Sequence, residues 1–202
     1  MRLSVEALSV ARGDRLLIER LSFVVDGGSV LHLQGRNGVG KTSLLEVLCG
    51  LRVPTEGRVL GAPEPADRHW LGHKNAVNPM LGPLENLRFW CALNGARAAD
   101  TEAALDCVGL RAQRHRPCGH LSTGQKRRAA LARLVAVPRR WWFLDEPLAG
   151  LDVAGLELFG VLLREHVQGG GAAVVTSHQA LPAGIAVQDL HIEPRRSRRA
   201  AP

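Results

Sequence analysis

Residues 35–42 read Gly35-Arg36-Asn37-Gly38-Val39-Gly40-Lys41-Thr42, and this stretch decides the fold. Residues 29–33 before it are mostly apolar and predict a short strand. Residues 41–49 after it place their leucines on one face of a helix, and Gly50 ends that pattern. Because a strand, a glycine-rich turn and a helix in this order begin a parallel α/β unit, the sequence predicts an α/β fold.

The same eight residues fit the phosphate-binding pattern G-x-x-x-x-G-K-[ST], known as the P-loop. Glycines let the backbone N–H groups approach phosphates closely, and the helix that follows directs its positive N-terminus at them. We expect Lys41 to reach the β- and γ-phosphates of a nucleotide and the Thr42 hydroxyl to hold Mg²⁺. The residues that we expect to contact the nucleotide here are Gly35, Arg36, Asn37, Gly38, Val39, Gly40, Lys41, Thr42 and Ser43.

Two carboxylates follow a second apolar run, residues 141–144. At the end of a buried strand, Asp145 can reach a Mg²⁺ ion, directly or through water, and Glu146 can polarise an attacking water as a general base. A further apolar run, residues 172–176, also predicts a strand buried on both faces. The sequence therefore predicts a parallel sheet with a nucleotide and a metal ion at one edge.

Residues 73–121 are predicted to be mostly helical and to interrupt this sheet. We expect one domain over residues 1–194, with a core of about 1–72 and 122–194 and an inserted helical subdomain of about 73–121. Apolar residues recur with helical spacing in four stretches, which are 84–93, 101–108, 124–137 and 154–167.

Residues 121–125, Leu-Ser-Thr-Gly-Gln, open the third of these helices. Ser122 and the free N–H groups of the first turn can form a second anion-binding helix start, although an ordinary N-cap has the same residue types. The five residues match L-S-x-G-Q, the signature of the ABC ATPases, which other P-loop families lack. The chain therefore resembles the ABC ATPases over nearly its whole length.

This resemblance implies a P-loop NTPase of the ABC nucleotide-binding-domain type, with a mixed, largely parallel sheet and ATP and Mg²⁺ as cofactors. Residues 149–152 are similar to the family's D-loop, and His178 is similar to the histidine that contacts the γ-phosphate. The implied catalytic residues are Lys41, Glu146 and His178, and the implied metal ligands are Thr42 and Asp145. Two copies would stack head to tail, so that Ser122, Gly124 and Gln125 of one copy meet the ATP held by the other.

Two positions depart from the family pattern. Arg12 stands near the expected aromatic residue; it could stack on adenine through its guanidinium, or be an exposed residue at a strand end. His73 stands where the family has a glutamine, and it could orient the catalytic water or respond to a membrane partner. Its role as a Mg²⁺ contact is in doubt because imidazole is a softer ligand than an amide oxygen.

Residues 71–73, 83–90 and 121–128 are similar to the ATP-binding subunit of the bacterial cytochrome c maturation (Ccm) haem-export system. That resemblance implies integral membrane partners and a peripheral location at the cytoplasmic face of the inner membrane. It also implies that hydrolysis drives haem export or haem release to a periplasmic chaperone. The alternatives are an ABC transporter for another substrate, a soluble ABC protein acting on DNA or ribosomes, and a non-catalytic nucleotide-dependent module.

The composition of the chain limits the kinds of partner that we expect it to bind. The net charge is +7, and much of the excess lies in residues 195–199, within a tail over 195–202 that we expect to be disordered or attracted to anionic lipid. Nucleic-acid binding is disfavoured because the other basic residues are scattered and tyrosine is absent. No stretch of 18 apolar residues occurs, so we expect membrane contact only through partners. The four cysteines form no C-x-x-C pair that would indicate a metal site.

Overall fold

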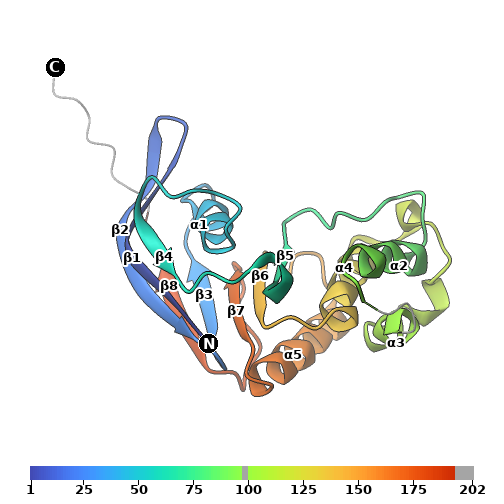
Figure 1. Ribbon diagram of the computed structural model, residues 1–202. Helices are drawn as coiled ribbons and strands as arrows, with labels where there is room; N and C mark the ends of the chain where they lie inside the picture. Colours follow the sequence, from blue (N-terminus) through green and yellow to red (C-terminus); the bar gives the residue numbers. More distant parts are fainter. Residues whose placement is uncertain (97–99, 194–202) are drawn as a thin grey trace.

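The computed structural model describes residues 1–96 and 100–193. The predicted disordered tail over 195–202 lies outside the described residues. The first layer is a three-stranded antiparallel sheet of order β2-β1-β4 (Figure 1). Its strands are β1 (Arg2–Arg12), β2 (Arg15–Asp26) and β4 (Glu56–Leu60).

A five-stranded parallel sheet of order β5-β6-β7-β3-β8 forms the centre of the core. Every residue of β6 and β7 is buried, which confirms the prediction that these two apolar runs are strands covered on both faces. The five strands are β3 (Val30–Gln34), β5 (Arg68–Leu71), β6 (Trp141–Asp145), β7 (Ala172–Thr176) and β8 (Val187–His191).

Helices cover the two faces of the parallel sheet. Helix α1 (Lys41–Leu48) lies between the two sheets, where its leucines share a core with Trp141 and Phe143 of β6 (Figure 1). Helix α5 (Val153–Gln168) packs on the opposite face, in a second core that contains Trp142 and Leu144. Alternate residues of β6 therefore enter different cores, as the two-residue repeat of a strand requires.

The predicted helical stretches are all present, and three helices form a separate lobe on the right in Figure 1. These helices are α2 (Pro83–Leu93), α3 (Asp100–Cys107) and α4 (Thr123–Ala136). Helix α4 begins at the residue after Ser122, and it packs against α2, α3 and α5. It therefore lies with the helical lobe in space, although the predicted boundary assigns residues 122–194 to the core. The remaining elements are the short 3-10 helices Pro65–Asp67, Arg111–Gln113 and Cys118–His120.

Candidate active site

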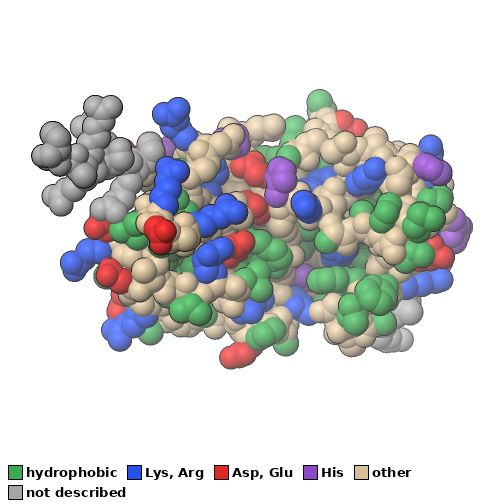
Figure 2. All heavy atoms as spheres, turned by 90° about the horizontal axis from the view of Figure 1, so that it is seen from above, with side chains coloured by type: hydrophobic (Ala, Val, Ile, Leu, Met, Phe, Trp, Pro, Cys, Tyr) green, Lys and Arg blue, Asp and Glu red, His purple; other side chains and the backbone are tan. Residues whose placement is uncertain are grey.

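A cavity of about 740 Å³ opens at the carboxyl edge of the parallel sheet, between this edge and the turn that joins β1 to β2. The view from above shows acidic and histidine side chains near the middle of this face, with basic side chains around them (Figure 2). The cavity brings together most of the predicted site residues. Those that line it are Arg12, Asn37, Gly38, Gly40, Lys41, Thr42, Ser43, His73, Asp145, Glu146 and His178.

The loop between β3 and α1 depends on glycine. Gly35, Gly38 and Gly40 all have positive φ angles, of 141°, 75° and 118°. A Cβ at Gly35 would lie 2.5 Å from the carbonyl oxygen of Ile192, so no larger residue fits there. The loop turns back toward the side chain of Lys41, whose Nζ donates to the carbonyl oxygen of Gly35 at 2.7 Å. The Lys41 ammonium group therefore lies against the backbone of the loop between β3 and α1.

Asp145 is buried at the end of β6 and is held by two hydroxyl groups. Thr42 Oγ1 lies 3.2 Å from Asp145 Oδ1 and 3.1 Å from Oδ2, and Thr176 Oγ1 donates to Oδ1 at 2.7 Å. A hydroxyl and a carboxylate are hard oxygen ligands of the kind that Mg²⁺ takes in proteins. The donor set of Thr42 and Asp145 therefore fits a Mg²⁺ ion bound with a nucleotide.

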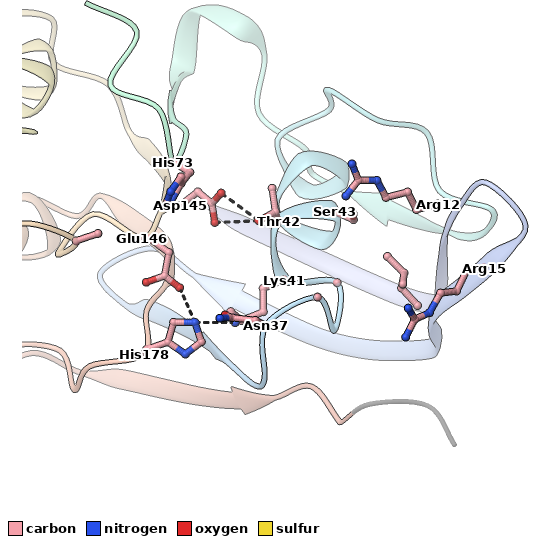
Figure 3. A pocket seen from close by; sticks show the side chains of 14 residues that line it. Arg12, Arg15, Asn37, Lys41, Thr42, Ser43, His73, Asp145, Glu146 and His178 are labelled. Atoms are coloured by element: carbon pink, nitrogen blue, oxygen red, sulfur yellow. Dashed lines mark hydrogen bonds and ion pairs between the residues drawn. The ribbon is translucent and has the colours of Figure 1, made fainter. Parts of the chain in front are cut away.

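Glu146 follows Asp145 and has a φ of 51°, a left-handed conformation that is unusual for a residue other than glycine. Its N–H group donates to Thr176 Oγ1 at 2.9 Å and to the Thr176 carbonyl at 3.1 Å. Its Oε1 lies 3.4 Å from His178 Nε2, which in turn lies 3.4 Å from Lys41 Nζ (Figure 3). A carboxylate, an imidazole and an ammonium thus meet at one side of the cavity.

Both positions that depart from the family pattern face the same cavity. His73 lies beside Asp145, and Arg12 lies on the far side of the cavity near Ser43 (Figure 3). Arg15, which the sequence pattern did not single out, pairs with Arg12 across the turn between β1 and β2 and also lines the cavity. The only sequence signal for Arg15 is the Arg-Gly-Asp-Arg stretch, two arginines around a Gly-Asp turn. Of the other lining residues, Ala149 begins the segment that is similar to the D-loop, and Leu17 was not predicted because it carries no polar signal.

Several predicted residues lie outside this cavity. Arg36 and Val39 line a neighbouring hollow of about 140 Å³, and Gly35 lines one of about 310 Å³ behind His178. The three signature residues also lie elsewhere. Ser122 Oγ accepts from the N–H of Gln125 at 3.2 Å, and Gln125 Oε1 accepts from the N–H of Ser122 at 3.0 Å, so they form a capping box.

Gly124 packs against the segment that follows the two carboxylates. A Cβ at Gly124 would lie 2.8 Å from the carbonyl oxygen of Gly150, so the close approach of these backbones requires glycine. Asp152, in the same segment, caps α5 by accepting from the N–H of Gly155 at 2.9 Å. The start of α4 and residues 150–152 are therefore neighbours, next to Ala149 at the cavity wall but not themselves lining the cavity.

The chain is similar to known proteins over nearly all its length. The family model described as ABC transporter matches residues 18–149. A cytochrome c biogenesis ATP-binding export protein CcmA from Rhodopseudomonas palustris (strain BisB5) is 41% identical over 198 residues, 95% of this chain and 98% of the relative. The protein of the same name from Mesorhizobium japonicum is 43% identical over 199 residues, with the same two coverages.

A solved structure gives the same result for the fold. It is described as the ATP-binding subunit of an ABC transporter, has a TM-score of 0.79 and 22% identity, and covers 88% of this chain and 80% of that one. At this identity the likeness supports the fold alone, while the family model and the relatives support membership. The chain therefore belongs to the ABC transporter family of ATP-binding proteins and, within it, to the group of the CcmA proteins.

Proposed function

We propose that this chain is the ATP-hydrolysing subunit of a membrane transporter for cytochrome c biogenesis, which powers haem export or haem release to a periplasmic chaperone. The observation that carries the proposal is the identity of 41–43% over 95% of the chain with relatives named for cytochrome c biogenesis. The cavity supports an ATPase because it combines a P-loop lysine with two carboxylates and a histidine. The alternative is a transporter for another substrate, and no contact among the residues that the structure describes favours it.

The proposed mechanism divides the chemistry among five residues. Lys41 and the N–H groups of the glycine-rich loop bind the phosphates of ATP, and Thr42 and Asp145 hold Mg²⁺. The metal ion neutralises charge on the phosphate oxygens when it is bound. Glu146 accepts a proton from the attacking water, and the neighbouring His178 donates a hydrogen bond to the γ-phosphate.

We propose that the working form contains two copies of this chain. Ser122, Gly124 and Gln125 lie at the start of α4, outside the cavity of their own copy, which supports a role at the nucleotide held by a second copy. In that arrangement ATP joins the two copies, and hydrolysis removes the contact and lets them separate. The opening and closing of the pair would then drive the membrane subunits.

Integral membrane subunits complete the proposed transporter, and we place this chain at the cytoplasmic face of the inner membrane. Within residues 1–96 and 100–193, no helix combines the length and the apolar character needed to span a membrane. Contact with the membrane would therefore come through the partner subunits. Nucleic acid is not among the proposed partners.

Arg12 is proposed to stack on the adenine ring, with Arg15 beside it. Cation–π contacts contribute about 0.5–2 kcal/mol, so Arg12→Ala should weaken ATP binding about two- to thirty-fold. Arg12→Trp should restore binding because an indole ring stacks on adenine as well. The measurement is the dissociation constant of ATP, with Arg2→Ala at the other end of β1 as the control. Unchanged affinity in Arg12→Ala would instead assign Arg12 as an exposed strand-end residue.

Deletion of the gene tests the biological role. We expect cells without this chain to contain apo-cytochromes c but almost no haem-bound c-type cytochromes, because haem no longer reaches them. Haem staining of denaturing gels measures the loss, and a plasmid copy should restore the bands while a Glu146→Gln copy should not. Normal haem-stained bands in the deletion strain would reject the cytochrome c role and favour a different transported substrate.

A further inference from the structure

Arg127 is the most deeply buried charged side chain among the described residues, with 2% of its surface exposed. It lies in the second turn of α4, five positions after Ser122, and it does not line the cavity. A buried guanidinium is strongly destabilising unless hydrogen bonds and nearby charges compensate it. The hydrogen bonds that compensate the buried charge of Arg127 show which segments of the chain this residue connects.

All five N–H donors of the guanidinium are used. An arginine has one N–H on Nε and two on each terminal nitrogen, fixed in a planar fork. The acceptors belong to two loops that are far apart in sequence, the first over residues 145–147 and the second over residues 72–75. They are the carbonyl oxygen of Pro147 for Nε (3.1 Å), the Gly72 carbonyl (3.0 Å) and Asn75 Oδ1 (3.0 Å) for Nη1, and the carbonyls of Asp145 (2.8 Å) and Glu146 (2.7 Å) for Nη2.

The first of these loops carries the proposed general base. The positive φ of Glu146 is a conformation that persists only where the surroundings enforce it. Thr176 holds the N–H group of Glu146, and Arg127 holds its carbonyl oxygen together with those of Asp145 and Pro147. Arg127 therefore shares the backbone of Glu146 with Thr176 and with the N–H group of Ala149, which donates to the Glu146 carbonyl at 3.1 Å. These contacts fix the backbone from which the Glu146 side chain reaches His178.

The second loop carries His73. Arg127 bonds to Gly72 and Asn75, the residues on either side of the segment that places His73 in the cavity wall beside Asp145 (Figure 3). One planar group thus sets the spacing between Glu146 and His73. Because the same residue is part of α4, its position also follows that of Ser122 and Gln125 at the start of the helix.

We propose that Arg127 is a positioning residue that joins α4 to both loops, so that contact of residues 122–125 with a second copy's nucleotide moves Glu146 and His73 in their own cavity. The proposal rests on the proposed function, since it assumes an ATPase that works as a pair. Arg127 touches neither nucleotide directly and acts through the loops. The two cavities of a pair would then be coupled through one guanidinium in each copy.

The pKa of Arg127 indicates that its guanidinium keeps its charge, and so its hydrogen bonds to both loops, at neutral pH. Burial lowers the pKa of Arg127 to about 10, while the neighbouring carboxylates of Asp145 and Glu146 act in the opposite direction. The group therefore stays charged at neutral pH and keeps all five donors. A lysine at this position would keep the charge but has only three donors and lacks the planar fork.

The test compares Arg127→Lys and Arg127→Gln with the wild-type full-length chain, and Arg128→Gln on the same helix is the control. The side chain of Arg128 approaches Gly109 at the end of α3 rather than the two loops. For each protein we would measure the dissociation constant of ATP, the number of ATP-binding sites per chain, and the hydrolysis rate per binding site. Displacement of catalytic groups by about 1 Å lowers rates on the order of 100-fold, which is the expected loss for both variants.

The outcomes separate a positioning role from a structural one. We expect both Arg127 variants to bind ATP with near wild-type affinity and stoichiometry while hydrolysis per site falls. A purely structural role would lower the number of binding sites and leave hydrolysis per site unchanged, which would overturn the proposal. Failure of Arg127→Lys to fold would overturn it as well. Absence of hydrolysis in the wild-type chain with its membrane subunits would instead refute the proposed ATPase function.

Discussion

Glu146→Gln should bind ATP about as well as the wild-type chain but hydrolyse it about 10²–10⁴-fold more slowly, because the amide cannot accept the proton of the attacking water. The side chain keeps its size, so the unusual backbone at this position and its contacts with Thr176 should be preserved. Phosphate release measures the loss. A reduction of this size corresponds to about 3–5 kcal/mol of transition-state stabilisation.

The same variant should also reveal the proposed pair. With ATP and Mg²⁺ present but not consumed, two copies should remain associated, and light scattering after size separation should give twice the mass of one chain. Glu157→Gln is the matched control, because Glu157 is an exposed residue of α5 far along the chain from the cavity residues. A single-chain mass for Glu146→Gln at saturating ATP would contradict the head-to-tail pair.

The part of the fold that the sequence predicted well is the part with continuous apolar runs. Strands β6 and β7 are buried at every residue, so their sequences contain almost nothing else and can hardly be missed. The five predicted helices were equally clear because each has an apolar face at helical spacing. With the predicted strand before the P-loop, all eight elements lie within a residue or two of their predicted bounds.

The antiparallel sheet was not predicted, and its geometry explains why. The pairing of β1 with β2 shifts register in three places, and Ala7 and Arg20 have positive φ angles. Each irregularity breaks the two-residue alternation that identifies a half-buried strand. Strand β8 was also missed: it lies at a sheet edge, is mostly exposed and contains polar residues such as Asp189.

The candidate site was predicted as a set of motifs but not as a set of contacts. Lys41, Thr42, Asp145 and Glu146 were recognisable because their spacing within each motif is short and specific. The hydrogen bonds of Thr176 to Asp145 and of Arg127 to the two loops join segments that are far apart in sequence. A single threonine or arginine has no local pattern that marks such a role, so only the folded chain reveals it.

Lys41→Ala should remove ATP hydrolysis almost completely and weaken ATP binding. A hydrogen bond to a charged group contributes about 1.5–3 kcal/mol, so the dissociation constant of ATP should rise about ten- to hundred-fold. The variant also lacks the ammonium group that stabilises the charge developing on the phosphate in the transition state. Loss of one such electrostatic contact lowers turnover by about 10²–10³-fold. Equilibrium binding of ATP and phosphate release measure the two effects separately.

The few lysines of this chain make the control informative. Besides Lys41 the sequence contains only Lys74 and Lys126, and Lys74 is exposed and does not line the cavity. Lys74→Ala should therefore leave ATP binding unchanged, which excludes a general effect of lost charge. Lys41→Arg should remain inactive, because Nζ of Lys41 sits in a closely wrapped turn 2.7 Å from the Gly35 carbonyl, where a planar guanidinium has no room. Wild-type turnover in Lys41→Ala would refute the P-loop assignment, and with it the ATPase on which the transporter proposal depends.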